Sequence, residues 1–374
     1  MRICMFSSVH FAFDARLQKE ARSLSRAGFE VTLIALEDPT PQEADDVQVL
    51  SLSKPRNRLL RMLGTLRVGL LALRQRADLY VFHDPELIPA GVLLKLLTRS
   101  PVVYDIHEIV AQQILTKEWL PRPLGLLALK SYQLVEWLAL PILDGLLLVV
   151  PGQLQHYARY RTQVVMNYPL LTYGSIGSEQ PESQPRPTLI YAGSARKIRG
   201  LYEMLELVSR LRRVYPDILL RLVGPVFPDD QDNVRNLIAA HGMEENVELL
   251  GRVSHREVHC QIAKADIGLA LIHPDPTYQD ALFTKAFEYM MMGKPFVVSN
   301  TPLWERIIEE TRSGLAVDPL SSEAVEAAIV QLLEDENLRI EMGARGREAV
   351  LSKYNWDVEG EKLVDFFREL TATS

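Results

Sequence analysis

The stretch that decides the fold is TLIYAGSARKIRGLYEMLELVSRLRRVYPDILLRLVGP, residues 188–225. It opens with an apolar run at residues 188–192, continues into a helical pattern over residues 200–215, and ends in a second apolar run at residues 219–223. Short apolar runs without polar alternation are typical of strands buried on both faces of a parallel sheet. A strand, a helix and a second strand in this order predict an α/β fold.

The same alternation runs through the whole chain. The predicted strands are residues 2–6, 30–36, 79–82, 102–104 and 146–150, then 188–192, 219–223, 247–250, 267–272, 295–299 and 315–317. A helix is predicted between the first two strands, at residues 16–27, where Gly28 follows as a stop signal.

Between the two groups of strands, residues 171–187 are rich in Gly, Ser and Pro, which indicates a linker. We therefore expect two doubly wound, parallel-sheet Rossmann-like domains, residues 1–170 and 188–353, with a ligand cleft between them. Residues 354–374 contain an aromatic, amphipathic helix that either caps the second domain or packs back on the first.

Composition and charge narrow the function classes. The chain has 374 residues, 47% of them hydrophobic and 24% charged, which suits a globular protein of two domains. Its net charge of −7 divides into +3 for residues 1–170 and −10 for residues 171–374, and this acidic second half argues against nucleic acid as a partner.

The termini and cysteines indicate the compartment. The first residues, MRICMFSS, form a predicted strand and not a signal peptide, and there is no uninterrupted apolar run of about 18 residues. The two cysteines, Cys4 and Cys260, match no metal-binding spacing and predict no disulfide framework. We expect a cytoplasmic protein.

The chemistry is concentrated in YQDALFTKAFEYMMMGKPFVVSN, residues 278–300. Here Asp280 and Glu288 are eight positions apart, with Lys285 between them. A helix is expected to start near Thr284, which would cap it, and to end at Gly293.

A loop that enters a helix N-terminus offers free backbone amides and the positive end of the helix dipole to a phosphate. Glu288, one turn into that helix, could accept hydrogen bonds from two ribose hydroxyls. The alternative is that Glu288 and Lys285 are a surface pair on an ordinary helix.

This segment resembles the C-terminal signature of glycosyltransferase family four, a large family of retaining enzymes with the two-domain GT-B fold. The signature is an acid and a Glu separated by seven residues, an aromatic residue, Met, a Gly-x-Pro step and an apolar strand. In this chain those positions hold Asp280, Glu288, Tyr289, Met290, Gly293, Pro295, Val297 and Val298.

The resemblance implies that Glu288 binds the ribose of a nucleotide-sugar donor. It also implies that Asp280 and the amides after it, those of Ala281, Leu282, Phe283 and Thr284, face the transferred sugar and its phosphates. The family's commonest residue at the first position is Glu, so Asp280 is one methylene shorter than usual.

Other loops of the second half carry the likeness further. In YAGSARKIRG, residues 191–200, the family uses the basic residues after Gly193 against the donor diphosphate, which implies this role for Arg199 and Arg196. Arg beside a tight Gly turn also suits a phosphate by its fork geometry, although a solvated turn is the alternative. After residues 250–251 (Leu-Gly), the resemblance places Arg252 and Val253 against the nucleobase.

The first half resembles a polysaccharide-synthesis branch of the family, through residues 14–16, 82–87 and 104–108. His107 follows a predicted strand at the position whose His faces the donor sugar in the family, and the alternative is a structural histidine. His83 also follows a strand and is expected on the acceptor side. Residues 7–10 (SSVH) stand where a Gly-rich loop is usual.

These features predict a retaining, hexosyltransferase-like enzyme whose donor is a UDP- or GDP-linked sugar and which needs no further cofactor. Arg196, Arg199, Lys285 and the amides of residues 281–284 would stabilise the leaving diphosphate without a metal. The one Asp-x-Asp, at Asp230 and Asp232, is expected to cap a helix that begins near Asn233.

The acceptor would be a glycan or a polyprenyl-linked saccharide in cell-surface polysaccharide or lipopolysaccharide synthesis. A GT-B nucleotide-sugar epimerase and a non-catalytic glycosyltransferase-like scaffold are the alternatives. A dinucleotide oxidoreductase is disfavoured, because no Gly-x-Gly-x-x-Gly follows residues 2–6 or 188–192.

Residues 54–76 (KPRNRLLRMLGTLRVGLLALRQR) hold seven Lys and Arg residues and no acid. Their leucines recur near one helical face, which is typical of a helix that lies on an anionic membrane. An ordinary domain helix with a solvated basic face is the alternative. We therefore expect peripheral binding at the inner face of the plasma membrane.

Overall fold

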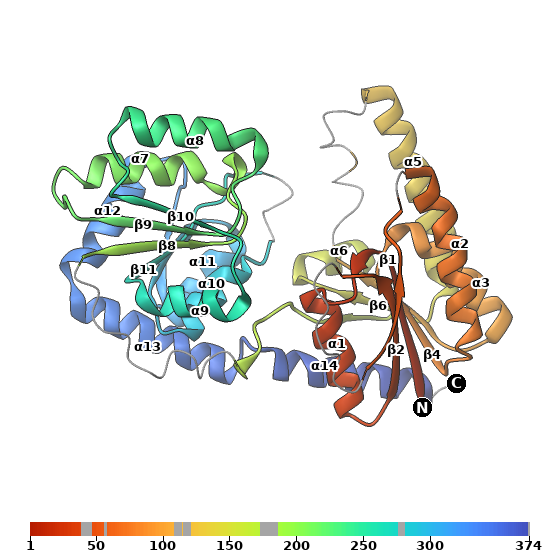
Figure 1. Cartoon of the computed structure of the whole chain (residues 1–374). Helices are drawn as coiled ribbons and strands as arrows, with labels where there is room; N and C mark the ends of the chain where they lie inside the picture. Colours follow the sequence, from red (N-terminus) through yellow and green to blue (C-terminus); the bar gives the residue numbers. More distant parts are fainter. Residues whose placement is uncertain are drawn as a thin grey trace. The chain divides into compact units, whose positions relative to one another are not determined.

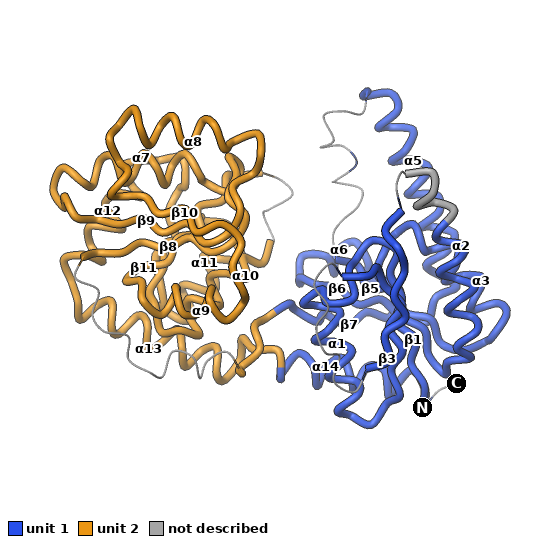
Figure 2. The backbone as a smooth tube through the Cα atoms, viewed as in Figure 1, with its two compact units in different colours: residues 1–167, 357–374 blue, residues 168–356 orange. Residues whose placement is uncertain are grey.

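The computed structural model describes residues 1–38, 47–55, 58–107, 114, 121–172, 186–275 and 281–372. The chain forms two compact units, shown in different colours in Figure 2. Unit 1 comprises Met1–Asn167 and Asp357–Ser374, and unit 2 comprises Tyr168–Trp356.

Unit 1 contains a seven-stranded parallel sheet in the order β3-β2-β1-β4-β5-β6-β7 (Figure 1). Its strands are β1 (Arg2–Phe11), β2 (Glu30–Leu36), β3 (Gln48–Leu52), β4 (Leu79–Phe82), β5 (Val102–Ile106), β6 (Gly145–Leu148) and β7 (Thr162–Val164). Its helices are α1 (Ala15–Arg26), α2 (Arg58–Arg74), α3 (Ile88–Thr98), α5 (Arg122–Ala139), α6 (Leu154–Tyr157) and α14 (Trp356–Ala372).

Alternate residues of these strands face opposite layers, as the period of two requires. Phe82 and Tyr104 belong to the core that α2, α3 and the end of α5 complete on one face. Gly145 faces α14, because a Cβ atom there would lie 2.7 Å from the ring of Phe366. The helix at the end of the chain therefore packs on the unit formed by the first 167 residues.

Unit 2 contains a six-stranded parallel sheet in the order β10-β9-β8-β11-β12-β13. Its strands are β8 (Thr188–Ala192), β9 (Leu219–Val223), β10 (Val247–Gly251), β11 (Ile267–Ala270), β12 (Phe296–Ser299) and β13 (Gly314–Val317). Its helices are α7 (Leu201–Leu211), α8 (Pro228–Ala240), α9 (His255–Lys264), α10 (Thr284–Met291), α11 (Pro302–Thr311), α12 (Ser322–Glu334) and α13 (Glu336–Ser352).

The predicted fold class is confirmed: both units are α/β with parallel, doubly wound sheets. Two local predictions are wrong. Phe283, and not Thr284, is the N-cap residue of α10, and no side chain caps that helix. Helix α8 begins at Pro228, five residues before Asn233, because the proline at its first position starts the helix there.

The linker predicted at residues 171–187 falls mostly outside the described residues. Among the helices that the structure does describe, none combines the length and the apolar character that a bilayer span requires.

Candidate functional site

Both sheets reverse their strand order at one point, between β1 and β4 in unit 1 and between β8 and β11 in unit 2. Loops on the two sides of such a point diverge, so ligands of open α/β sheets bind there, beyond the carboxyl ends of the strands. Each unit carries a polar site at this place.

In unit 2 the site is a cavity of about 370 Å³. Ten of the residues that the sequence singled out line it: Gly193, Arg199, Arg252, Val253, Ala281, Leu282, Phe283, Thr284, Lys285 and Glu288. The loops after β8 and β10 and the start of α10 supply them, so residues up to 95 positions apart in sequence meet at one edge of the sheet.

The floor of this cavity requires glycine at two positions. Gly193 has φ +130°, a backbone conformation that residues with a side chain rarely adopt. Gly224 has φ +137°, and a Cβ atom there would lie 2.2 Å from the carbonyl oxygen of Gly193. Neither position tolerates a larger residue without a backbone shift.

Arg199 is held at the cavity by the residue that replaces the family's usual arginine. Its Nη1 atom donates to Oγ of Ser194 at 2.5 Å and to the Ser194 carbonyl oxygen at 3.3 Å. Ser194 therefore orients a guanidinium from the neighbouring turn, and the cavity keeps a cation at this wall.

Lys285 is the second cation of the cavity. Its Nζ atom lies 4.8 Å from the centre of the Tyr191 ring. Burial, and then the charge of Arg199, lower the pKa of Lys285 to about 8, although Glu288 acts in the opposite direction. Two positive charges thus lie close together where water is partly excluded. A bound anionic ligand would offset their mutual repulsion and their loss of hydration.

Helix α10 is fixed by a tyrosine under the site. The Tyr289 hydroxyl donates to the carbonyl oxygen of Leu269 at 3.1 Å and accepts from the Ala192 amide at 3.0 Å. Gly268 makes room for its ring, since a Cβ atom there would lie 2.2 Å from Cδ2 of Tyr289. These contacts position the neighbouring Glu288 at the cavity wall.

One of the predicted donor-site residues lies elsewhere, and another is not described. Arg196 is not among the lining residues, and its guanidinium lies over the ring of Phe227, 4.0 Å from the ring centre. Asp280 lies outside the described residues. The sequence also missed His255 and Val258, which line the cavity from the first turn of α9.

In unit 1 the site is a cluster of buried charges around Asp105, the fourth residue of β5. Nε and Nη2 of Arg16, on α1, pair with the two carboxylate oxygens of Asp105 at 3.0 and 2.9 Å. Burial alone would raise the pKa of Asp105, but Arg16 and His107 hold it well below its usual range. Asp105 is therefore a fixed anion.

The two histidines that the sequence singled out meet at this carboxylate. His107 Nε2 lies 2.8 Å and His83 Nδ1 lies 3.1 Å from Oδ2 of Asp105. His83 is buried, and burial lowers its pKa. His107 keeps part of its ring exposed, so it is the histidine that a ligand can reach.

A second acid completes the cluster. Oε1 of Glu20 lies 2.9 Å from Nε of Arg16. Burial, and then the charge of Asp105, raise the pKa of Glu20 well above its usual range. No sequence pattern indicated Glu20, because Glu20 comes close to β5 only through the packing of α1 on the sheet.

Residues 7–10, which stand where a Gly-rich loop is usual, lie within β1 and already hold an anion. Oδ2 of Asp84 accepts from the Ser7 hydroxyl at 2.8 Å and from the Ser8 amide at 2.6 Å. The Val9 amide lies 3.3 Å from the same oxygen. The Asp84 carboxylate thus accepts hydrogen bonds from the backbone amides that a Gly-rich loop would offer to a phosphate.

His83, Asp105 and His107 offer three atoms within 4.8 Å of one another, a spacing that could hold a metal ion. However, both oxygens of Asp105 are paired with Arg16, and a dication would lie beside that buried guanidinium. Hydrogen bonds from the two imidazoles to the carboxylate account for the arrangement better.

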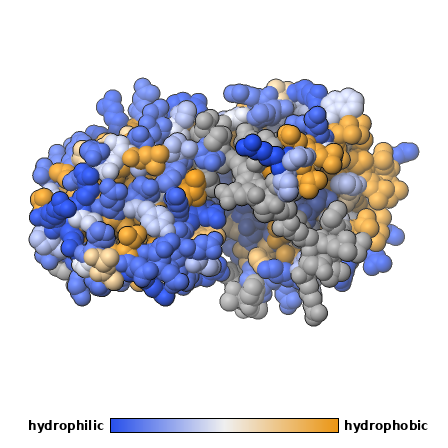
Figure 3. Space-filling view, turned by 90° about the horizontal axis from the view of Figure 1, so that it is seen from above, coloured by the Kyte–Doolittle hydropathy of each residue, from blue (hydrophilic) through white to orange (hydrophobic). Residues whose placement is uncertain are grey.

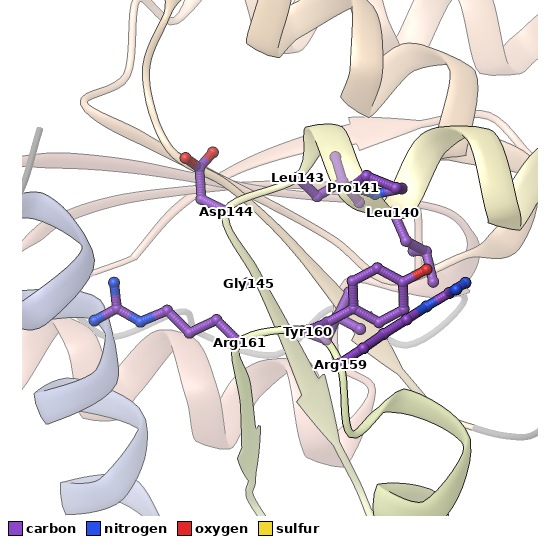
Figure 4. Close-up of a pocket in the computed structure, with 9 residues that line it drawn as sticks. Leu140, Pro141, Leu143, Asp144, Gly145, Arg159, Tyr160 and Arg161 are labelled. Atoms are coloured by element: carbon purple, nitrogen blue, oxygen red, sulfur yellow. The ribbon is translucent and has the colours of Figure 1, made fainter.

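A further cavity of about 420 Å³ lies in unit 1 at the amino ends of β6 and β7 (Figure 4). Two of its ionic groups are paired, Asp144 with Lys95 at 2.7 Å and Arg161 with Glu369 at 3.0 Å. It lies at the edge of the sheet opposite to the Asp105 cluster, so it is a weaker candidate for substrate binding.

Comparison with known proteins covers both units. Residues 14–166 match the family model "Glycosyl transferase 4-like domain", and residues 176–349 match the model "Glycosyl transferases group 1". The chain is also 27% identical, over 187 residues, to a GDP-mannose-dependent alpha-(1-6)-phosphatidylinositol monomannoside mannosyltransferase of Mycobacterium tuberculosis. That match covers 49% of this chain and 48% of the relative, and the chain spans about half the length of the curated relatives it matches.

Solved structures share the fold over the whole chain. The sucrose-phosphate synthase of Thermosynechococcus elongatus superimposes with a TM-score of 0.79 at 17% identity, covering 100% of both chains. Anabaena Alr3699/HepE in complex with UDP-glucose superimposes with a TM-score of 0.75 at 16% identity, covering 99% of this chain and 100% of the other.

Proposed function

The chain belongs to glycosyltransferase family four, and from this premise we propose that it moves a sugar from a nucleotide-diphospho-sugar to a saccharide acceptor with retention of configuration. The observation that supports the donor half of this proposal is the unit 2 cavity. There Arg199, Lys285 and the uncapped start of α10 converge on one space.

The proposed chemistry follows from the charges. As the bond from the anomeric carbon to the diphosphate breaks, negative charge grows on the phosphates, and preorganised cations and amides stabilise it. Arg199, Lys285 and the first-turn amides of α10 do this without a metal. On the same face the leaving diphosphate takes the proton of the acceptor hydroxyl.

For the donor we propose a UDP- or GDP-linked hexose, with Glu288 on the ribose and Arg252 and Val253 against the base. The relatives support this range, since one name specifies GDP-mannose and one structure holds UDP-glucose. Asp280 and His107 are proposed to face the transferred sugar.

For the acceptor we propose a glycan or a polyprenyl-linked saccharide in cell-surface polysaccharide synthesis, reached from the cytoplasmic side of the plasma membrane. The mannosyltransferase relative, whose name specifies a phosphatidylinositol acceptor, supports a lipid-linked class. Residues 54–76 would supply the basic contact with the anionic surface. In α2, Val68 and Ala72 face the core, while Leu66 and Arg67 are exposed.

Donor binding tests the proposal most directly. We expect UDP or GDP, and one of their hexose conjugates, to raise the Tm of the full chain, and the same ligand to raise the Tm of the Lys285→Met variant less. Transfer to an acceptor, with the product anomer identified by NMR, then separates a transferase from an epimerase. A chain that binds no nucleotide sugar would contradict the proposal.

A further inference from the structure

The largest exposed apolar surface of the described chain lies on three neighbouring helices of unit 1. Twelve of the 21 exposed large hydrophobic side chains belong to α2, α3 and α5. In unit 2 such side chains are scattered singly, as on an ordinary soluble surface. In Figure 3 hydrophobic side chains gather on the part of the surface that unit 1 forms.

The surface is continuous because the three helices lie side by side. Helix α3 packs against both α2 and α5. A Cβ atom on Gly69 of α2 would lie 3.0 Å from Cβ of Ala90 in α3, so these two helices approach closely. Contiguous apolar patches of several side chains on a monomer mark a site of interaction.

Helices α3 and α5 supply most of this surface. Eight of their side chains are each between 52% and 62% exposed, and six of these are Leu93, Leu97, Leu124, Leu127, Leu134 and Trp137. On α5, residues 124, 127 and 134 recur at the spacing of one helical face. We call these six side chains the apolar face.

The charges around the apolar face indicate what covers it. Helices α2, α3 and α5 contain seven Lys and Arg residues and one acid, Glu136. Glu136 accepts hydrogen bonds from Tyr132 at 3.0 Å and from Tyr157 at 2.9 Å, and Lys95 pairs with Asp144 at 2.7 Å. By composition the three helices still carry a clear excess of positive charge. Arg67 and Arg74 are exposed on α2, beside α3.

We propose that the apolar face of α3 and α5, flanked by the basic α2, is the surface with which this protein lies on an anionic lipid bilayer. This rests on the proposed function, because a lipid-linked acceptor is met at such a surface. A second copy fits less well: a symmetric contact through this face would place the arginines of one protomer near those of the other.

Lipid fits each part of the surface. Leucine side chains at the acyl boundary and basic side chains among anionic head groups are the composition of an interfacial helix. The ring of Trp137 suits the boundary between the two layers. The sequence alone assigned both the apolar and the basic contact to residues 54–76. With the apolar face described above, α5 makes the apolar contact with the bilayer and α2 makes the electrostatic contact.

Co-sedimentation of the full chain with vesicles tests this. We expect binding to phosphatidylcholine vesicles that contain phosphatidylglycerol, weaker binding without the anionic lipid, and release by salt. The double variant Leu127→Gln/Leu134→Gln should partition at least about tenfold less, from the apolar area lost. The matched double variant Ile340→Gln/Leu351→Gln, on equally exposed positions of α13, should bind like the wild type.

Two results would overturn the proposal. One is vesicle binding that is absent in the wild type or unchanged in the α5 variant. The other is a wild-type dimer in sedimentation velocity that the α5 variant dissolves, which would assign the face to a second copy. The thermal shift with UDP and GDP, measured on the same preparations, distinguishes a failure of this proposal from a failure of the proposed donor site. The shift should persist in the α5 variant. Its absence in the wild type would count only against the donor site.

Discussion

The Oδ2 atom of Asp105 lies 2.8 Å from Nε2 of His107. Because Arg16 and His107 hold the pKa of Asp105 well below its usual range, the carboxylate is ionised at neutral pH and Nε2 of His107 carries the donated proton. The other ring nitrogen, Nδ1, is then the one that His107 presents to a ligand. A buried aspartate thus sets both the tautomer and the orientation of the histidine.

Replacing this carboxylate should therefore affect both activity and stability. We expect Asp105→Asn to lower kcat at least about tenfold through the misplaced imidazole. It should also cost about 3 kcal/mol of unfolding free energy, because the buried Arg16 then keeps only Glu20, whose pKa is raised, as an acidic partner. The matched variant Asp144→Asn, which removes a half-exposed ion pair with Lys95 in the same unit, should cost less than about 1 kcal/mol and leave kcat unchanged. Steady-state kinetics and urea unfolding measure the two effects, and equal effects of the two variants would contradict the role of Asp105.

Glu288 at the wall of the unit 2 cavity should be needed for the donor. Glu288→Ala removes charge-assisted hydrogen bonds to the ribose and is expected to lower kcat/KM about 100-fold or more. Glu309→Ala, on the exposed side of α11, is the control and should keep the wild-type value. Near-native turnover in Glu288→Ala would contradict the proposed role of Glu288 in binding the donor.

Lys285 should make donor affinity depend on pH. Its pKa of about 8 means that the free protein loses this positive charge as the pH rises through 8, whereas a bound diphosphate favours the charged form. We expect the Kd for UDP to rise about tenfold between pH 7 and pH 9. Isothermal titration calorimetry measures it, and Lys285→Met should bind more weakly and lose this dependence.

The same lowered pKa has a consequence for stability. In the unfolded chain Lys285 keeps its proton up to its usual pKa of 10.5, so between about 8 and 10.5 the unfolded state binds more protons than the folded state. The contribution of Lys285 to the unfolding free energy therefore becomes more favourable as the pH rises through this window. This contribution is absent in Lys285→Met, so the wild-type stability should rise relative to that of the variant between about pH 8 and 10.5, as urea unfolding at several pH values would measure.

Two glycine-to-alanine substitutions should have opposite signs. At Gly268 the new Cβ atom would lie 2.2 Å from the ring of Tyr289, so Gly268→Ala should cost about 2 kcal/mol or more and displace α10 from the cavity. At Gly64, inside α2, no atom lies within 4 Å, so Gly64→Ala should stabilise by about 0.5 kcal/mol through helix propensity. Thermal unfolding of both variants checks the pair, and a neutral Gly268→Ala would contradict the packing described for Tyr289.

Sequence patterns predicted the strands of the unit 2 sheet and the interior strands of the unit 1 sheet, but missed both edges of the unit 1 sheet. The strands β2, β4, β8 and β9 have the predicted bounds, since each is a mostly apolar run whose residues are largely buried. The edge strands β3 and β7 were missed, because their partly exposed residues carry no apolar run. The polar residues 7–10 extend β1 because Asp84, far along the chain, satisfies their amides and hydroxyls.

The candidate site divides in the same way. Residues close together in sequence, such as Lys285 and Glu288, line one cavity, because a loop and a helix start fix their spacing. Arg16 and Glu20 could not be assigned to the cluster at Asp105, because they reach it across 89 and 85 positions through the packing of α1. The guanidinium of Arg196 lies over the ring of Phe227, a contact that no local sequence pattern indicated.

The placement of α14 has a consequence for how the protein is made. The residues that complete unit 1 are translated after all of unit 2. Until then Phe366 cannot pack beside Gly145, and Glu359 cannot accept the hydrogen bond from the backbone amide of Met166. During synthesis unit 2 can fold from a contiguous stretch as it leaves the ribosome, while unit 1 stays unfinished until the last helix emerges. A stalled or truncated translation product should therefore contain a folded second unit and an incomplete first one, which is a ready target for chaperones and proteases.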